Sequence, residues 1–390
     1  MTVENPQALK AERKKTITDA VRQNPDAKRI PLMSSFGAWP IHPAGYKLTE
    51  ALSNYDLLDQ IMGDFHEKYN FDMYQGYFSR YYYRVTHVMG DGGLLFDDEL
   101  GSVYYLDETL LHPEEYDFLI ENGLAKTTYE KMFPRKFPFY SREDAIEKIK
   151  AALVEQRDLN AANAKRTKLF LEHYGVPSRS GLSQNSAIDD FYPQTGMKNF
   201  GIQLRRLPES KIMDIIQAFD NGRKERILSG IENYVDSDDF IYAYSLTSIS
   251  SSMLSINQFG KYAWDLYWKP NADKIVEKDL LGNFFPEGSY LHLRDFFRDL
   301  PAGHFSILTE QDDPFEVAKI LPNITIEGGF PTTTLGKGTK EQVVDKVKEL
   351  IDKLGKKLIL SPDKMLVYPS DCNPANLDVM LETAREYGKY

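Results

Sequence analysis

The chain has 390 residues, of which 42% are hydrophobic and 27% are charged, the composition of a soluble globular protein. Its formal net charge of −11 argues against a nucleic-acid-binding surface and against binding to anionic lipid. No apolar run approaches the roughly 20 residues of a transmembrane helix, the first residues do not form a signal peptide, and the single cysteine excludes a disulfide framework. The simplest compartment is therefore the cytoplasm.

The amino-terminal half predicts helices, two short strands and an insertion. The polar helix at the start has only a weak apolar face, made by Ile17, Ala20 and Val21. The insertion combines a glycine-rich turn with β-rich runs, which predicts an antiparallel hairpin. The expected elements are helix 1–28, strand 29–33, helix 48–69, strand 71–74, the hairpin within 78–106 with its turn at 90–93, and a polar helical region at 112–174.

The carboxyl-terminal half alternates amphipathic helices with short apolar strands. This rhythm predicts a parallel sheet covered by helices, and no G-x-G-x-x-G motif opens the chain to indicate a dinucleotide fold. The expected helices are 208–220, 223–233, 272–280, 314–321, 339–354 and a last one beginning at Pro374, and the expected strands are 240–244, 284–285, 305–308, 324–326 and 358–360.

The number of these units favours a (β/α)8 TIM barrel, an α/β fold, over a doubly wound sheet. We predict one domain over residues 1–390, with an inserted α+β subdomain at about 78–180 and an amino-terminal helical extension. In such barrels, functional sites are built from the loops that follow the strands.

Carboxylates occur in three consecutive loops of this kind. They are Glu287, then Glu310 with Asp312, then Glu327. If these loops are neighbours, the carboxylates converge on one cavity, where crowding raises their pKa values and allows them to act as acids near neutral pH. The alternative is that each one caps a loop, forms a salt bridge or is simply exposed.

Histidine and cysteine do not define a metal site. The seven histidines are scattered and no pair has metal-ligand spacing. Cys372 lies near the start of the last helix, where a small packing residue is expected rather than a nucleophile. We therefore assign no residue as a metal ligand.

Several segments resemble the uroporphyrinogen decarboxylase superfamily. At the carboxyl terminus ILSPDK, from Ile359, matches the family pattern ILSPGC and is followed by P-x-x-N and by a helix that ends E-Y-G-x-Y. The resemblance covers 185–390 well and 29–80 weakly. Further matching segments are Ser255–Phe259 with Tyr267–Pro270, Glu287–Gly288, Leu300–Gly303 with Thr309–Lys319, Ile326–Pro331 and Gly338–Thr339.

The resemblance separates two activities. Decarboxylases of the family carry M-R-Q-A-G-R after the first strand, whereas residues 33–38 here read MSSFGA, without an arginine to hold substrate carboxylates. The segments are most similar to the corrinoid-dependent methyltransferase branch, in particular the component that demethylates aromatic methyl ethers. This resemblance implies methyl transfer from a small aromatic methyl ether to cob(I)alamin on a separate corrinoid protein.

The resemblance also bears on zinc. Zinc-bearing members have H-x-C after one strand and a cysteine after the last, where this chain has Leu308-Thr309-Glu310 and Lys364. Zinc activation of a thiol therefore has no support, whereas an ether needs a hydrogen-bond donor at its departing oxygen. Candidate catalytic residues are Glu310, ranked first because it stands at a zinc-ligand position of the relatives, then Glu287, Asp312 and Tyr74.

The substrate's ring is expected among aromatic side chains near the barrel mouth. The residues proposed to bind it are Phe36, Tyr82, Phe330, Gln75 and Glu327, together with Tyr74. Two other functions stay open: a corrinoid-dependent methyltransferase for another donor, such as a methylamine, thioether or halide, and a non-catalytic barrel. The oligomeric state, including a homodimer, is also open.

Overall fold

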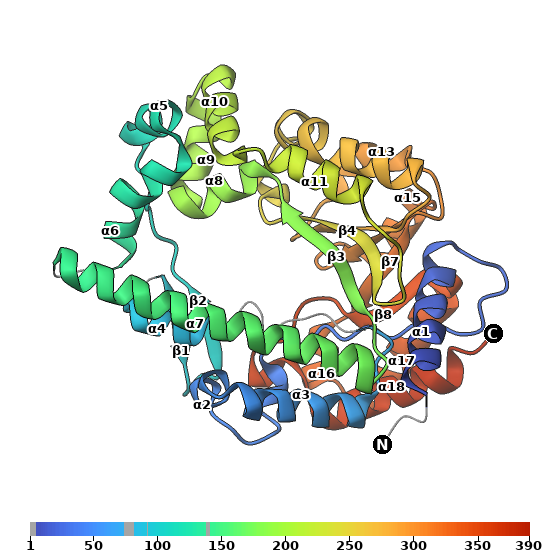
Figure 1. Cartoon of the computed structure of the whole chain (residues 1–390). Helices are drawn as coiled ribbons and strands as arrows, with labels where there is room; N and C mark the ends of the chain where they lie inside the picture. Colours follow the sequence, from blue (N-terminus) through green and yellow to red (C-terminus); the bar gives the residue numbers. More distant parts are fainter. Residues whose placement is uncertain (1–4, 74–81, 92, 138–140) are drawn as a thin grey trace.

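The centre of the molecule is a parallel sheet of six strands whose spatial order follows the sequence, from β3 to β8. The computed structural model describes residues 5–73, 82–91, 93–137 and 141–390 (Figure 1). The strands are β3 (Ser178–Asn185), β4 (Phe240–Ser248), β5 (Gly282–Pro286), β6 (Phe305–Thr309), β7 (Thr325–Phe330) and β8 (Leu358–Pro362).

The two strands expected near the amino terminus are reduced to short bridges. Leu32 pairs in parallel with Leu360 of β8, and Met33 pairs in parallel with Met73. These two segments extend the six-stranded sheet to eight positions in barrel order. Between the described residues, no backbone pairing joins the Met73 segment to β3. The predicted TIM-type α/β barrel is confirmed, with two minimal strands.

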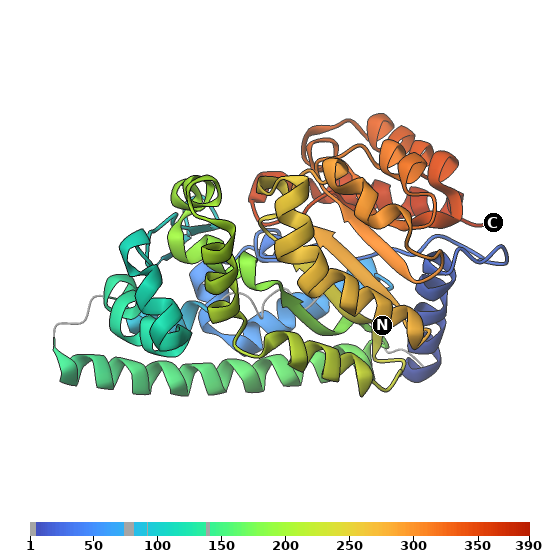
Figure 2. The ribbon, with the colours of Figure 1, turned by 90° about the horizontal axis from the view of Figure 1, so that it is seen from above.

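Amphipathic helices cover the outside of the sheet (Figure 2). In α17 the apolar side of the predicted amphipathic helix is buried, with Val343, Val347 and Leu350 fully shielded from solvent. In α18, which begins at Pro374 as predicted, the side chain of Asn373 caps the helix by accepting from the N–H of Ala375. The main covering helices are α11 (Arg223–Glu232), α13 (Lys269–Glu277), α15 (Pro314–Ile320), α16 (Thr332–Lys337), α17 (Lys340–Leu354) and α18 (Pro374–Tyr387).

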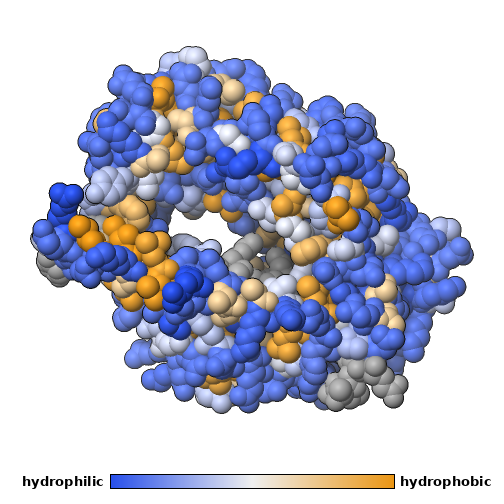
Figure 3. Space-filling view, in the orientation of Figure 1, coloured by the Kyte–Doolittle hydropathy of each residue, from blue (hydrophilic) through white to orange (hydrophobic). Residues whose placement is uncertain are grey.

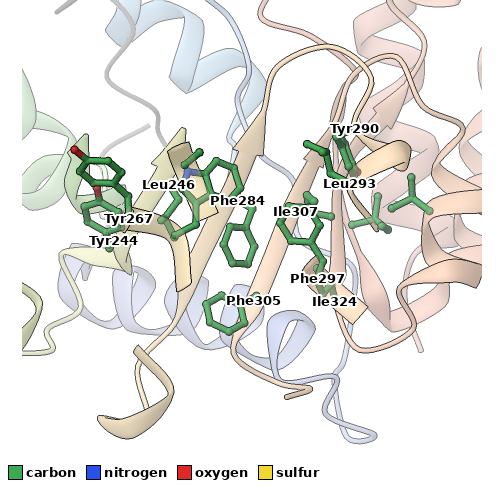
Figure 4. Close-up of a cluster of buried hydrophobic side chains, with 14 of the residues drawn as sticks. Tyr244, Leu246, Tyr267, Phe284, Tyr290, Leu293, Phe297, Phe305, Ile307 and Ile324 are labelled. Atoms are coloured by element: carbon green, nitrogen blue, oxygen red, sulfur yellow. The ribbon is translucent and has the colours of Figure 1, made fainter. Parts of the chain in front are cut away.

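Large apolar side chains fill the layer between strands and helices. Phe284, Phe305 and Ile307 project from β5 and β6 towards Phe297 and Leu293 (Figure 4). The ring of Trp268 stacks on Phe284 at 5.4 Å between centroids. Trp268 ends a π-helical stretch, Gly260–Trp268, which follows α12 (Ile256–Phe259); α14 (Arg294–Arg298) completes this side of the barrel.

The amino-terminal helix closes one end of the barrel. Ile17 and Val21 of α1 (Pro6–Val21) pack with interior residues such as Met33, Leu308 and Ile359. The hydroxyl of Thr325, at the start of β7, donates to the carbonyl of Ala20. This end carries the amino ends of the strands, so any site at the carboxyl ends lies opposite α1.

The inserted region forms a hairpin and part of a helical lobe. Strands β1 (Leu94–Asp97) and β2 (Ser102–Tyr105) pair antiparallel, which confirms the hairpin, but its turn lies between them at 98–101 and not at 90–93. Before this hairpin, within the range where it was expected, Tyr83 begins a helix. The other elements are α4 (Tyr83–Met89), α5 (Tyr116–Thr127), α6 (Phe133–Lys136) and the long α7 (Arg142–Lys168).

The lobe also contains helices that follow the predicted insertion in the sequence. In Figure 1, α8 (Ala187–Thr195), α9 (Met197–Arg206) and α10 (Glu209–Asp220) lie beside α5. Helix α7 runs along the edge of the molecule from the lobe towards α3 (Tyr55–Tyr69). Figure 3 shows an open space bounded by α7, the lobe and the barrel.

Two local expectations are corrected. The helix expected over 48–69 divides into α2 (Leu48–Ser53) and α3, because Asn54 leaves the helical conformation and caps α3 with its side chain. Strand β3 was not expected at all, since its sequence SRSGLSQN has no apolar alternation. In the part of the chain that the structure describes, no helix has both the length and the apolarity needed to cross a membrane.

Candidate functional site

A cleft of about 460 Å³ opens at the carboxyl ends of β6, β7 and β8. It lies where sites of TIM barrels are built. Ionisable and hydroxyl side chains dominate its walls, and its rim is exposed to solvent. The lining residues are Glu310, Gln311, Thr332, Thr333, Lys337, Asp363, Lys364, Ser370 and Asp371.

Glu310 enters this cleft directly after the last residue of β6. The N–H of Gly288, in the loop after β5, donates to Oε2 of Glu310 over 2.9 Å. Gly288 has a φ of +79°, and a Cβ there would lie 3.1 Å from the hydroxyl oxygen of Ser252. Only glycine meets both demands without strain, so the loop after β5 is shaped to hold the carboxylate of Glu310.

The surroundings of Glu310 favour its protonated form. Burial raises the pKa of this carboxyl above its ordinary value, and the negative charge of Asp363 adds to the rise. The Gly288 hydrogen bond and the positive charge of Lys364 act in the opposite direction, but the net pKa shift is upward. The upward pKa shift makes Glu310 a better candidate for a proton donor than an unperturbed glutamate.

Asp363 and Lys364, after β8, form the opposite wall. Oδ1 of Asp363 accepts from the N–H of Thr332 over 3.1 Å and also from its hydroxyl. Burial raises the pKa of Asp363 in spite of these hydrogen bonds. Nζ of Lys364 lies 3.0 Å from Oδ1 of Asp371, which holds the cation at the cleft. The cleft thus combines two acids of raised pKa with a nearby positive charge.

Asp312 accepts hydrogen bonds from the loop that follows β5. Its Oδ1 accepts from the hydroxyl of Ser289 over 2.6 Å, and its Oδ2 accepts from the N–H groups of Tyr290 and Leu291 over 2.7 and 3.1 Å. With both oxygens engaged, Asp312 holds the loop that carries Gly288. We therefore assign it a positioning role in place of the expected catalytic one.

Glu287 is half-buried and faces the lobe. Its negative charge contributes, after burial, to the raised pKa of Tyr192 in α8. Its backbone is tied to the loop after β4, since the hydroxyl of Ser251 donates to its carbonyl over 3.1 Å. Glu287 does not line the cleft of Glu310. The expected convergence of three carboxylate loops on one cavity is therefore replaced by the pairing of Glu310 with Asp363.

Glu327 lies inside the barrel, not at its mouth, and is fully buried. One oxygen pairs with Arg179 of β3, and the other accepts from the hydroxyls of Tyr242 and Ser306. Arg179 also donates to Oδ1 of Asn283 over 2.8 Å. The interior network accounts for both carboxylate oxygens, so we leave Glu327 out of the substrate-binding residues.

The expected aromatic cage is not assembled by the described residues. Phe36 is fully buried against Phe65 and Phe71, with ring centroids 5.0 and 5.5 Å away. Phe330 is also fully buried in the layer between strands and helices. Both point away from the mouth because alternate residues of a barrel strand face outwards. Tyr82 is exposed on the inserted region, and Tyr74 and Gln75 lie outside the described residues.

The sequence predictions omitted Asp363, Lys364 and Thr332 from the candidate residues. The rule that selects loops after strands includes the segment after β8, but Asp363 and Lys364 were not chosen as functional residues from it. Arg179 was missed with its strand. Within the described ranges, no three His, Cys, Asp or Glu side chains gather in an arrangement able to hold a metal ion.

Comparisons with known proteins extend these observations. No family model matches the chain, and no curated protein matches it in sequence. Among solved structures, a methyltransferase from Methanosarcina mazei is similar, with a TM-score of 0.57 and 11% sequence identity. The match covers 96% of this chain and 98% of that one. The two proteins therefore share a fold over nearly their whole length.

Proposed function

We propose that this protein is a methyltransferase that demethylates a methoxylated aromatic compound and passes the methyl group to cob(I)alamin on a separate corrinoid protein. The observation that carries the proposal is the acid pair of Glu310 and Asp363 at the carboxyl ends of the strands. The shared fold with a protein named as a methyltransferase supports the same reaction class. The motifs similar to the corrinoid-dependent branch supply the substrate and the acceptor.

The chemical problem is the leaving group. When the methyl–oxygen bond breaks, the oxygen keeps the electron pair and becomes a phenolate, whose conjugate acid has a pKa of about 10. A carboxyl group that is still protonated near neutral pH can donate its proton to that oxygen as the bond breaks. The raised pKa of Glu310 favours the protonated form that can give this proton, and the product then leaves as a neutral phenol.

The neighbours of Glu310 have distinct roles in this proposal. Burial raises the pKa of Glu310 most, and the negative charge of Asp363 adds to the rise. The hydrogen bonds from Thr332 hold the carboxylate of Asp363 in place. Lys364 opposes this pKa rise and can stabilise negative charge that develops on the substrate oxygen. Gly288 orients the carboxyl group, since its N–H holds Oε2. Glu310 is the catalytic residue of this set, and the others position or tune it.

The methyl acceptor must reach the cleft from outside. When bound, the corrinoid supplies the strong nucleophile that attacks the methyl carbon. The rim residues Gln311, Lys337 and Ser370 are exposed, so a group carried by another protein can approach the cleft. The residues of this chain fit a reaction in which the acceptor comes from a partner.

The experiment is to mix the purified chain with cob(I)alamin and a panel of methoxyarenes under anaerobic conditions. We expect methylcobalamin to form, followed by its absorbance, together with one equivalent of the corresponding phenol. If the folded protein forms no methylcobalamin with any of the ethers, the proposal is contradicted.

A second candidate function follows from the lining of the cleft. The described residues that line it are polar or charged, and none of them is aromatic. Two carboxyl groups in such a cleft suit a small cationic donor, such as a methylamine, better than an apolar ring. Methylamines in the same assay separate the two candidates: methylcobalamin with an amine and with no ether favours this second function.

A further inference from the structure

Helix α7 carries an apolar stripe on its free side. The helix has 27 residues, and its first half runs along the outer edge of the molecule. Ile146, Leu153 and Val154 on this half are 41%, 65% and 48% exposed. Figure 3 shows apolar surface gathered over this part of α7. A long helix with large apolar side chains in solvent indicates a surface for another protein.

The opposite side of α7 is already used within the chain. Arg84 of α4 forms an ion pair with Glu155 at 2.5 Å, and Leu159 is buried. Further along, Nε of Arg166 lies 2.7 Å from Oδ1 of Asp59. The helix is therefore anchored along one side, and its stripe stays on the side that no described element covers.

The face of α7 that carries Ile146 and Val154 of this stripe is self-complementary about Lys150. At 100° per residue, Glu143, Ile146, Lys150, Val154 and Arg157 fall on one face of the helix. When this face meets a second copy running in the opposite direction, with Lys150 at the centre, Ile146 lies opposite Val154. In the same arrangement Glu143 lies opposite Arg157, which matches opposite charges twice.

We propose that α7 forms a two-fold homodimer interface with the α7 helix of a second copy of this chain. A two-fold axis brings the same patch of both copies together, so a self-complementary pattern is what such an interface requires. Glu147 neutralises Lys150 near the axis, since their charged groups lie 2.9 Å apart. A helix pair of this length is a small interface, so the dimer forms reversibly and depends on protein concentration.

The first test measures the mass of the full chain by sedimentation over a range of concentrations. We expect a monomer–dimer equilibrium, weakened in Leu153→Glu and unchanged in the control Val235→Lys, because Val235 is exposed on the loop between α11 and β4 and does not belong to the stripe. Glu143→Arg places like charges opposite each other at two symmetric points and should weaken the dimer about tenfold or more. Adding Arg157→Glu to Glu143→Arg should restore it.

The second test fixes the geometry by cross-linking. Lys150→Cys places a thiol at the axis, so mild oxidation should give a covalent dimer; the native Cys372 is buried and does not compete. Ala161→Cys is the matched control on the same face, because its symmetry mate would be about 33 Å away along the helices. Helical content by circular dichroism checks that each variant folds.

Two results overturn the proposal. One is a chain that stays monomeric at every concentration, with no cross-link through Lys150→Cys. The other is a dimer that forms but is not restored by the exchange of Glu143 and Arg157, or that cross-links equally through Ala161→Cys. Either result would assign the stripe to a different partner.

Discussion

Glu327 and Glu310 lie on neighbouring strands or at their ends, yet their surroundings are opposite. Glu327 is fully buried in the barrel, and Arg179, Tyr242 and Ser306 occupy both of its oxygens. Glu310 is half-buried at the mouth, and the N–H of Gly288 donates to one of its oxygens. Burial raises the pKa of Glu310 with no cation paired closely enough to reverse the shift.

The difference shows how one barrel separates stability from chemistry. An ion pair and hydroxyl donors stabilise the charge of Glu327, which fixes the strands around it. Partial burial with few partners instead raises the pKa of Glu310 and leaves the group reachable from the cleft. Removing Glu327 should therefore damage the fold, whereas changes around Glu310 should alter activity.

The largest effect on stability is expected for Glu327→Ala. The change leaves Arg179 buried without its carboxylate, and the loss of one partner of a buried ion pair costs about 3–5 kcal/mol. Denaturant unfolding of the full chain measures this loss. Glu382→Ala on the exposed side of α18 is the control and should change the free energy of unfolding by less than about 0.5 kcal/mol. Similar values for the two variants would contradict a structural role for Glu327.

A smaller loss is expected for Asp312→Ala. Without the carboxylate, the Ser289 hydroxyl and the N–H groups of Tyr290 and Leu291 lose their acceptor, which costs about 1–3 kcal/mol. The same unfolding experiment measures it. Activity should fall only as far as the displaced loop disturbs Gly288, so Asp312→Asn, which keeps an acceptor, should retain more activity than the alanine variant. Equal, complete loss in both variants would return Asp312 to the catalytic residues.

The sequence predicted the fold better than the site, for physical reasons. Stripes such as Val343, Val347 and Leu350 report directly on helix packing. The barrel was predicted from the number of units in which such helices alternate with short apolar strands. Strand β3 was not predicted because it contributes polar side chains such as Arg179 to the barrel interior, and its sequence therefore lacks an apolar pattern. Phe36 and Phe330 were misplaced because loop position alone does not tell which way a strand-end side chain points. Glu310 and Asp363 line the same cleft because the loops after β6 and β8 lie near each other in the folded chain, which no local sequence pattern records.

The smallest predicted effect is a pair of opposite shifts in the pH dependence of activity. In the proposed mechanism the protonated form of Glu310 is the active one, so activity should be present below its pKa and be lost as pH rises through it. Asp363→Asn removes a negative charge that raises this pKa, so the alkaline limb should move to lower pH. Lys364→Met removes a positive charge that lowers it, so the limb should move to higher pH. Shifts of the same sign in both variants would contradict the tuning scheme.

The central claim is that Glu310 donates the proton to the leaving group. The most direct measurement is the single-turnover rate of methyl transfer against pH for the wild-type chain and for Glu310→Gln. The account predicts that the wild-type rate falls at alkaline pH, and that the glutamine variant is about 10²–10⁴ times slower with no such limb. A glutamine variant that matches the wild type in rate and in pH profile would contradict the account.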